Sequence, residues 1–138
     1  MSVEQQKAVI HRLVDGFWNQ HNDGVLDEVI ALDFLDHSAM PGGPGGREGM
    51  KQAMLPFRAA FSNGHTSIDD AVCDGDKVAW RWSFQGTHTG DLMGIPATGK
   101  TVALTGITID HIAHSQIVER WNQMDMMGLM QQLGVGAG

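Results

Sequence analysis

Residues 74–85 read Asp-Gly-Asp-Lys-Val-Ala-Trp-Arg-Trp-Ser-Phe-Gln, and this stretch decides the fold. Its first four residues have the composition of a tight hairpin turn. After the turn, apolar side chains recur at every second residue, at Val78, Trp80, Trp82 and Phe84. A period of two places these side chains on one face of a strand. The stretch therefore predicts a long strand with an aromatic face, paired through the turn with a strand over 66–73.

Strand patterns continue after this hairpin, and helical patterns precede it. Residues 101–111 and 117–124 are predicted as strands, and 126–133 as a short closing helix. Apolar residues at helical spacing predict a first helix from about residue 3, where Ser2 and Gln5 have capping-box spacing. A helical patch over 26–32, a strand over 34–37 and an irregular Gly- and Pro-rich run over 40–46 follow. A second helix is expected over 47–61, kinked or split by Pro56. Helices followed by an antiparallel meander indicate one α+β domain over residues 1–138.

Charge and composition exclude several classes of partner. The chain has 138 residues, with 9 Lys and Arg against 16 Asp and Glu, a formal charge of −7. This balance argues against a nucleic-acid backbone or an anionic membrane surface. The N-terminal segment mixes charged and apolar residues, unlike a signal peptide, and Cys73 is the single cysteine. We therefore expect a cytoplasmic protein with no nucleic-acid or membrane partner.

Two motifs suggest ligands that the sequence does not otherwise support. Residues 94–101 match the nucleotide-binding pattern G-x-x-x-x-G-K-[ST], but a strand pattern follows the lysine where that motif needs a helix. We interpret it as a chance match in a hairpin loop. His111 and His114 are three residues apart at the end of a strand, where they do not align as helical metal ligands do. We expect no metal and no cofactor.

Several segments carry a family resemblance that covers nearly the whole chain. They are Gly-Asp-Lys-Val-Ala-Trp-Arg-Trp at 75–82, Gly-Thr-His-Thr-Gly at 86–90, Gly-Ile-Pro-Ala-Thr-Gly-Lys at 94–100, and Ile-Val-Glu-Arg-Trp-Asn-Gln-Met-Asp at 117–125. Together with Gln-Gln-Leu-Gly at 131–134, they resemble the SnoaL-like polyketide cyclase family. The resemblance implies an NTF2-like fold, in which N-terminal helices close a cone-shaped, bent antiparallel sheet around a deep apolar pocket.

The resemblance also implies a reaction. Cyclases of this family close a ring by intramolecular aldol condensation without metal or cofactor, and their general acid–base is an aspartate four residues after the strand tryptophan. Here that aspartate is Asp125, after Trp121. A carboxylate in an apolar pocket becomes a stronger base because desolvation raises its pKa. The expected substrate is a small apolar, polyketide-like ketone activated as a β-dicarbonyl.

Further site residues follow from strand alternation and from the resemblance. Alternation places Ile117, Glu119, Trp121, Gln123 and Asp125 on one face of their strand. By resemblance, His111 and His37 also point into the pocket, and His111 is the second catalytic candidate. Gln123 stands where the cyclases have a histidine, and glutamine donates hydrogen bonds but carries no proton. The expected substrate-binding residues are His37, Gln123, Trp121, Trp82 and Phe57.

Other interpretations of the same residues stay open. Asp125 precedes a helix and suits an N-cap, and the tryptophans suit a core. The chain has no tyrosine, which removes the tyrosine-dependent isomerases and dehydratases of this fold. The alternative function is a non-catalytic small-molecule-binding or dimerisation module, since a fold does not fix a function. In either case the resemblance implies a homodimer or homotetramer.

Overall fold

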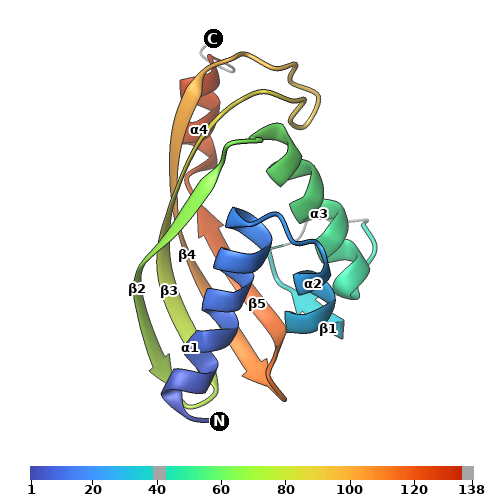
Figure 1. Ribbon diagram of the computed structural model, residues 1–138, viewed down its shortest axis with the longest axis vertical. Coiled ribbons are helices and arrows are strands. Elements are labelled where there is room, and N and C mark those ends of the chain that lie inside the picture. The colour runs from blue at the N-terminus through green and yellow to red at the C-terminus, as the bar shows by residue number, and fades with distance from the viewer. Residues whose placement is uncertain (39–42, 135–138) are drawn as a thin grey trace.

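The computed structural model describes residues 1–38 and 43–134, which form one bent sheet with helices packed on one face (Figure 1). The sheet has five strands in the order β1-β5-β4-β3-β2. Strands β2 (His65–Asp74), β3 (Lys77–Thr87), β4 (Thr101–Ala113) and β5 (Gln116–Met124) form the predicted antiparallel meander. The α+β class is confirmed.

Strand β1 (Ile30–Asp36) corrects the predicted topology. It starts four residues before the predicted strand and pairs in parallel with β5, with Asp36 opposite Arg120. The helix before it, α2 (Gly24–Val29), is correspondingly earlier than the predicted patch at 26–32. Local sequence patterns carry no information on pairing between strands so far apart in the chain.

The helices begin close to where the sequence places them. In α1 (Val3–Arg12), the Ser2 hydroxyl accepts from Gln5 N at 3.1 Å and the Gln5 side chain accepts from Ser2 N at 2.8 Å, which confirms the capping box. The helix continues as a wider π-helix, η1 (Leu13–Asn19). α3 (Gly46–Ala60) runs through Pro56 without being split, and α4 (Met126–Leu133) has the predicted bounds.

No helix of the described residues is both long and apolar enough to cross a membrane.

Two segments of the chain, one of them within the predicted irregular run, fall outside this description. Residues 39–42 of the Gly- and Pro-rich run and residues 135–138 of the C-terminus lie outside the described residues. The chance nucleotide motif at 94–101 lies in the loop that enters β4, and a strand follows its lysine as predicted.

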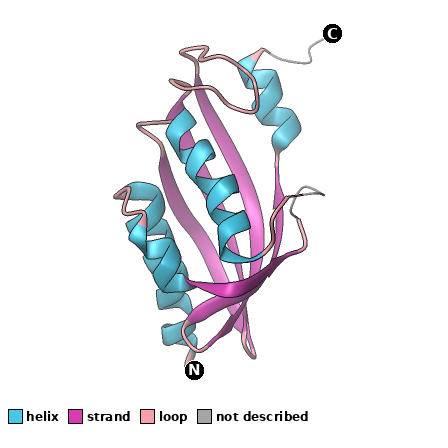
Figure 2. Cartoon of the chain, turned by 90° about the vertical axis from the view of Figure 1, so that its right-hand side faces the viewer, coloured by secondary structure: helices cyan, strands magenta, loops and turns pink. Residues whose placement is uncertain are grey.

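The inner face of the sheet carries two separate clusters of buried apolar side chains. One packs α1, η1, α2 and β1 against the sheet at Val78, Trp80, Ile112 and Ile117. The other joins the end of α3 and α4 to Phe84 and Leu104. Figure 2 shows α3 lying across this face of the sheet. Trp82 packs against both clusters and therefore lies between them.

Candidate functional site

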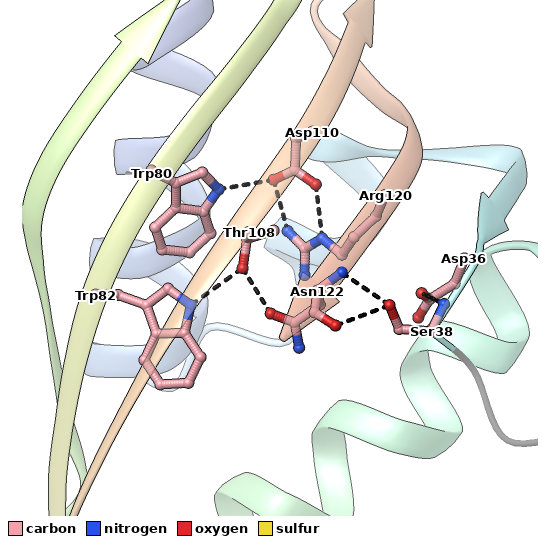
Figure 3. Close-up of polar contacts among 8 residues, drawn as sticks. All are labelled: Asp36, Ser38, Trp80, Trp82, Thr108, Asp110, Arg120 and Asn122. Carbon is pink, nitrogen blue, oxygen red and sulfur yellow. Dashed lines mark hydrogen bonds and ion pairs between the residues drawn. The ribbon is translucent and has the colours of Figure 1, made fainter. Parts of the chain in front are cut away.

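A buried ion pair joins the inner faces of β4 and β5. Arg120 Nε donates to Asp110 Oδ1 at 2.6 Å, and Arg120 Nη2 donates to Asp110 Oδ2 at 2.8 Å. Trp80 Nε1 donates to Asp110 Oδ2 at 3.0 Å, so three donors hold this fully buried carboxylate (Figure 3). Burial acts to lower the pKa of the Arg120 guanidinium, but the charge and hydrogen bonds of Asp110 outweigh it and raise that pKa. Three donors thus hold the Asp110 carboxylate in one position, which indicates a structural role.

A second polar chain crosses the sheet one step further along. Trp82 Nε1 donates to Thr108 Oγ1 at 3.0 Å, and Thr108 Oγ1 donates to Asn122 Oδ1 at 2.7 Å. Ser38 holds the backbone of Asn122, accepting from its N–H at 2.8 Å and donating to its carbonyl at 2.9 Å (Figure 3). Trp82 and Asn122 are both half-buried. This chain therefore presents polar atoms between the two apolar clusters.

A bulge changes which residues of β5 face inward. His111 is paired with Glu119, but Ile112 is paired with Ile117, so Val118 has no partner in β4. The extra residue turns Ile117 to the inner face together with Arg120 and Asn122. The prediction that Ile117 shares a face with Glu119, Trp121 and Gln123 is therefore wrong, because alternation assumes a regular strand.

Three predicted site residues meet on the opposite, outer face. His37 Nε2 lies 2.7 Å from Glu119 Oε2, and its ring stacks on Trp121 with centroids 4.7 Å apart. His111 Nε2 lies 2.7 Å from Asp76 Oδ2, and its Nδ1 lies 3.5 Å from Glu119 Oε1. The hydrogen bond from His37 is the main cause that lowers the pKa of Glu119, and that from His111 lowers the pKa of Asp76. The structure thus brings His37, His111 and Trp121 together, on the face away from Trp80 and Trp82.

Asp125 lies at the junction of β5 and α4. Its Oδ1 accepts from Gly128 N at 2.9 Å, so the carboxylate is the N-cap of α4. Asp125 also borders a shallow groove of about 300 Å³, with Arg81, Ile107 and Gln123. Within the described part of the chain, its side-chain hydrogen bonds are confined to its own helix.

Trp82 and Phe57, the other two predicted binding residues, lie on the inner side. Phe57 of α3 packs against Phe84, with ring centroids 5.7 Å apart, and against Trp18 at 6.1 Å. Trp18, Phe57 and Trp82 are all half-buried. The deep apolar pocket stays a prediction. Two depressions that the described residues form are the groove at Asp125 and an open one of about 500 Å³ beside α1.

Four polar residues of the inner face were absent from the predicted site: Thr108, Asp110, Arg120 and Asn122. The sequence contains a signal for two of these residues, because Thr108 and Asp110 stand at alternate positions of a predicted strand. Polar residues that face a core in this way need hydrogen-bond partners there. Their partners on β5 depend on the bulge, which the sequence pattern does not reveal.

Comparisons with known proteins identify the family of this chain and several relatives. The family model described as SnoaL-like polyketide cyclase matches residues 8–133. The chain is 28% identical to aklanonic acid methyl ester cyclase DnrD of Streptomyces peucetius, over 94% of this chain and 90% of that one. Among solved structures, TsrD from Streptomyces laurentii superposes with a TM-score of 0.88 at 26% identity, covering 97% of this chain and 98% of TsrD. IdmH from Streptomyces antibioticus has a TM-score of 0.81 at 32% identity, covering 95% and 99%.

Proposed function

Because this chain belongs to the SnoaL-like polyketide cyclase family and has its NTF2-like fold, we propose that it is a cofactor-independent cyclase. The reaction is an intramolecular aldol ring closure of an activated, β-dicarbonyl ketone. The general acid–base is the Asp125 carboxylate.

One observation supports this assignment: a hydrogen bond holds the Asp125 carboxylate through one oxygen and leaves the other oxygen without a hydrogen bond to the described residues. Gly128 N holds Oδ1, whereas Oδ2 has no hydrogen-bond partner among residues 1–38 and 43–134. A fixed carboxylate needs no reorientation before it takes a proton, and its open oxygen offers the lone pair. By contrast, both carboxylate oxygens of Asp110 accept hydrogen bonds, Oδ1 from Arg120 and Oδ2 from Arg120 and Trp80.

The proton and the electrons balance within the substrate and this one side chain. Asp125 removes the proton between the two carbonyls, and the resulting enolate carbon forms a bond to a ketone carbon of the same molecule. The π electrons of that carbonyl move to its oxygen, which becomes an alkoxide. Protonated Asp125 returns the proton to the alkoxide. His111 takes no step in this scheme, since its Nε2 is hydrogen-bonded to Asp76 and its Nδ1 lies 3.5 Å from Glu119 Oε1.

The test is turnover of aklanonic acid methyl ester, the compound in the name of the relative DnrD. Asp125→Asn keeps an N-cap acceptor and removes the base, so we expect an intact fold with turnover reduced about 10²-fold or more. Asp91→Asn, which removes one exposed carboxylate from the loop before β4, is the matched control. Unchanged turnover in Asp125→Asn overturns the assignment.

A non-catalytic dimerisation module is the second candidate, favoured by the outer face of the sheet. Val72, Ile107 and Ile109 are exposed there by 60%, 53% and 38%. Apolar side chains grouped on one sheet face are typical of a contact between proteins. We propose that this face pairs with a second copy, as a homodimer or within a homotetramer. Sedimentation should give an oligomer for the native chain and a monomer for Ile107→Lys; a native monomer rejects the pairing.

A further inference from the structure

Arg81 lies on the outer face of the sheet, across β4 from Asp125. It pairs with Ile107 of β4, and Ile107 pairs with Gln123 of β5, so these three side chains form one row across three strands. Neighbouring strands lie about 4.8 Å apart, which separates the Cα atoms of Arg81 and Gln123 by about 10 Å. Asp125 follows two residues after Gln123, and its N–H donates to the carbonyl of Thr105 at 3.1 Å. Arg81 and Asp125 thus line the same shallow groove of about 300 Å³ from opposite sides.

The guanidinium of Arg81 keeps its hydrogen-bond donors available. Its Nη1 lies 3.7 Å from Asp69 Oδ2, which is an ion-pair distance and too long for a hydrogen bond. The Asp69 carboxylate accepts from the Ser83 hydroxyl. Among residues 1–38 and 43–134, the side chain of Arg81 has this ion pair and no hydrogen bond. The charge of Asp69 therefore orients the guanidinium, and the N–H groups are left for a ligand.

The groove combines one cation and one anion with apolar surface. Among the described residues that line it, Arg81 is the one cation and Asp125 is the one anion. Ile107 and Met124, which are exposed by 53% and 38%, supply apolar surface between them. This lining fits a flat ligand that lies on Ile107 and carries a negative charge at the edge nearest Arg81.

We propose that Arg81 binds an oxygen of the enolate that forms when Asp125 takes the proton. This inference rests on the proposed function and names its ligand class, which is β-dicarbonyl compounds bound as planar enolate anions. Loss of the proton leaves one negative charge shared by the two carbonyl oxygens of the substrate. A guanidinium keeps its own proton and donates to anionic oxygens, so the contact strengthens as that charge develops. Asp125 is neutral while it holds the proton, so the anion then meets one positive charge and no negative charge in the lining of the groove.

The experiment compares two probes of nearly the same shape that differ in charge. They are 2-phenyl-1,3-indandione, which is an enolate anion at neutral pH, and the neutral ketone 2-phenyl-1-indanone. Calorimetric titration at neutral pH gives the ratio of the dissociation constant of the ketone to that of the enolate. Arg81→Gln should lower this ratio about three- to tenfold by removing the charged donor. The factor is modest because the Arg81 side chain is 56% exposed, so water screens its charge.

Two further variants separate the contact from the overall charge of the protein. Asp125→Asn should raise the ratio, because it removes the carboxylate that repels an enolate formed before binding. Arg12→Gln is the matched control, since its side chain is 44% exposed and lies outside the groove. It removes one positive charge from the chain and should keep the native ratio.

The ratio also separates loss of the contact from damage to the fold, because a folding defect weakens both probes together. An unchanged ratio in Arg81→Gln, or an equal fall in Arg12→Gln, overturns the proposal. Failure of the native protein to bind the enolate probe also overturns it, and is the result expected if a second copy of the chain covers this face. Turnover is measured separately. A ratio that depends on Arg81, in protein whose turnover does not depend on Asp125, would reject the proposed base and keep Arg81 as the residue that binds the enolate.

Discussion

The guanidinium of Arg120 binds both oxygens of Asp110, with Nε to Oδ1 at 2.6 Å and Nη2 to Oδ2 at 2.8 Å. Arg120 is 7% exposed and Asp110 is 0% exposed. Two opposite charges are thus buried side by side on neighbouring strands. Replacing one of these residues leaves the other charge unpaired in the core, which lowers the free energy of unfolding. Replacing both leaves no unpaired charge in the core, so this loss does not arise.

The first prediction concerns this pair. Arg120→Met should lower the free energy of unfolding by about 3–5 kcal/mol, because Asp110 keeps a buried charge. The double variant Asp110→Asn with Arg120→Met should lose less than Arg120→Met alone, since the amide oxygen that replaces the carboxylate would still accept from Trp80. Urea unfolding measures the free energies of the native protein and of both variants.

A surface pair provides the matched control. Arg12 Nε and Glu28 Oε2 lie 2.7 Å apart, with side chains 44% and 54% exposed. Arg12→Met should therefore cost about 1 kcal/mol or less. Equal losses in Arg12→Met and Arg120→Met would contradict a special role for burial.

The second prediction concerns the contact of Gly106 with Trp82. In Gly106→Ala, the new Cβ would overlap the indole and lie 2.8 Å from the carbonyl oxygen of Gln123. The indole must shift, which weakens its bond to Thr108, and we expect a loss of about 1–3 kcal/mol in stability. Gly24→Ala, at the start of α2 where a Cβ meets only Asn22 Oδ1 at 3.4 Å, is the control. A native tryptophan emission spectrum and native stability in Gly106→Ala would refute the prediction.

The third prediction is a pH dependence of stability at Glu119. Its hydrogen bond to His37 lowers its pKa below the ordinary value of 4.5, so the folded protein binds this proton more weakly than the unfolded chain. The resulting stabilisation is present above 4.5 and is lost as the pH falls through the lowered pKa. The melting temperature of Glu119→Gln should therefore fall less than that of the native protein between about pH 5 and pH 3. Glu48→Gln, which removes an exposed carboxylate from α3, should follow the native curve.

The sequence predicted the meander and the helices because their signals are local. The turn at 74–77 and the alternation of Val78, Trp80 and Trp82 lie within one hairpin, and Ser2 with Gln5 lies within one helical turn. The parallel pairing of β1 with β5 was missed because it joins segments at opposite ends of the chain. Two adjacent elements, α2 and β1, begin two and four residues before their predicted starts.

The site was harder to predict than the fold because one unpaired residue decides which side chains face inward. With Val118 outside the ladder, Arg120 and Asn122 face the core, whereas Trp121 and Gln123 face outward. Alternation counted from Ile117 gives the reverse. Trp82 and Phe57 were placed on the inner side because their segments contain no such irregularity.

The fourth prediction separates the two roles of Asp125. Asp125→Ala removes the acceptor that holds Gly128 N, so it should lower stability by about 1 kcal/mol, whereas Asp125→Asn should lower it much less. Both variants should lose turnover, because neither carries a carboxylate. Thermal unfolding and turnover, measured on the same samples, distinguish the cap from the base. Equal stability of the two variants would contradict the cap.

The last prediction moves the carboxylate without removing it. A Cβ at Gly128 would overlap Oδ2 of Asp125 and lie 2.7 Å from its Cγ, so Gly128→Ala must turn the side chain away. Alanine favours a helix over glycine by about 1 kcal/mol, close to what the weakened cap costs, and we expect nearly native stability. Turnover should nevertheless fall, because the open oxygen leaves the position from which it takes the proton. Met127→Ala, at a residue 75% exposed on the same helical turn, should change neither quantity. Since the base is present and the fold is intact in Gly128→Ala, native turnover in that variant would show that the fixed position of Asp125 has no part in the reaction.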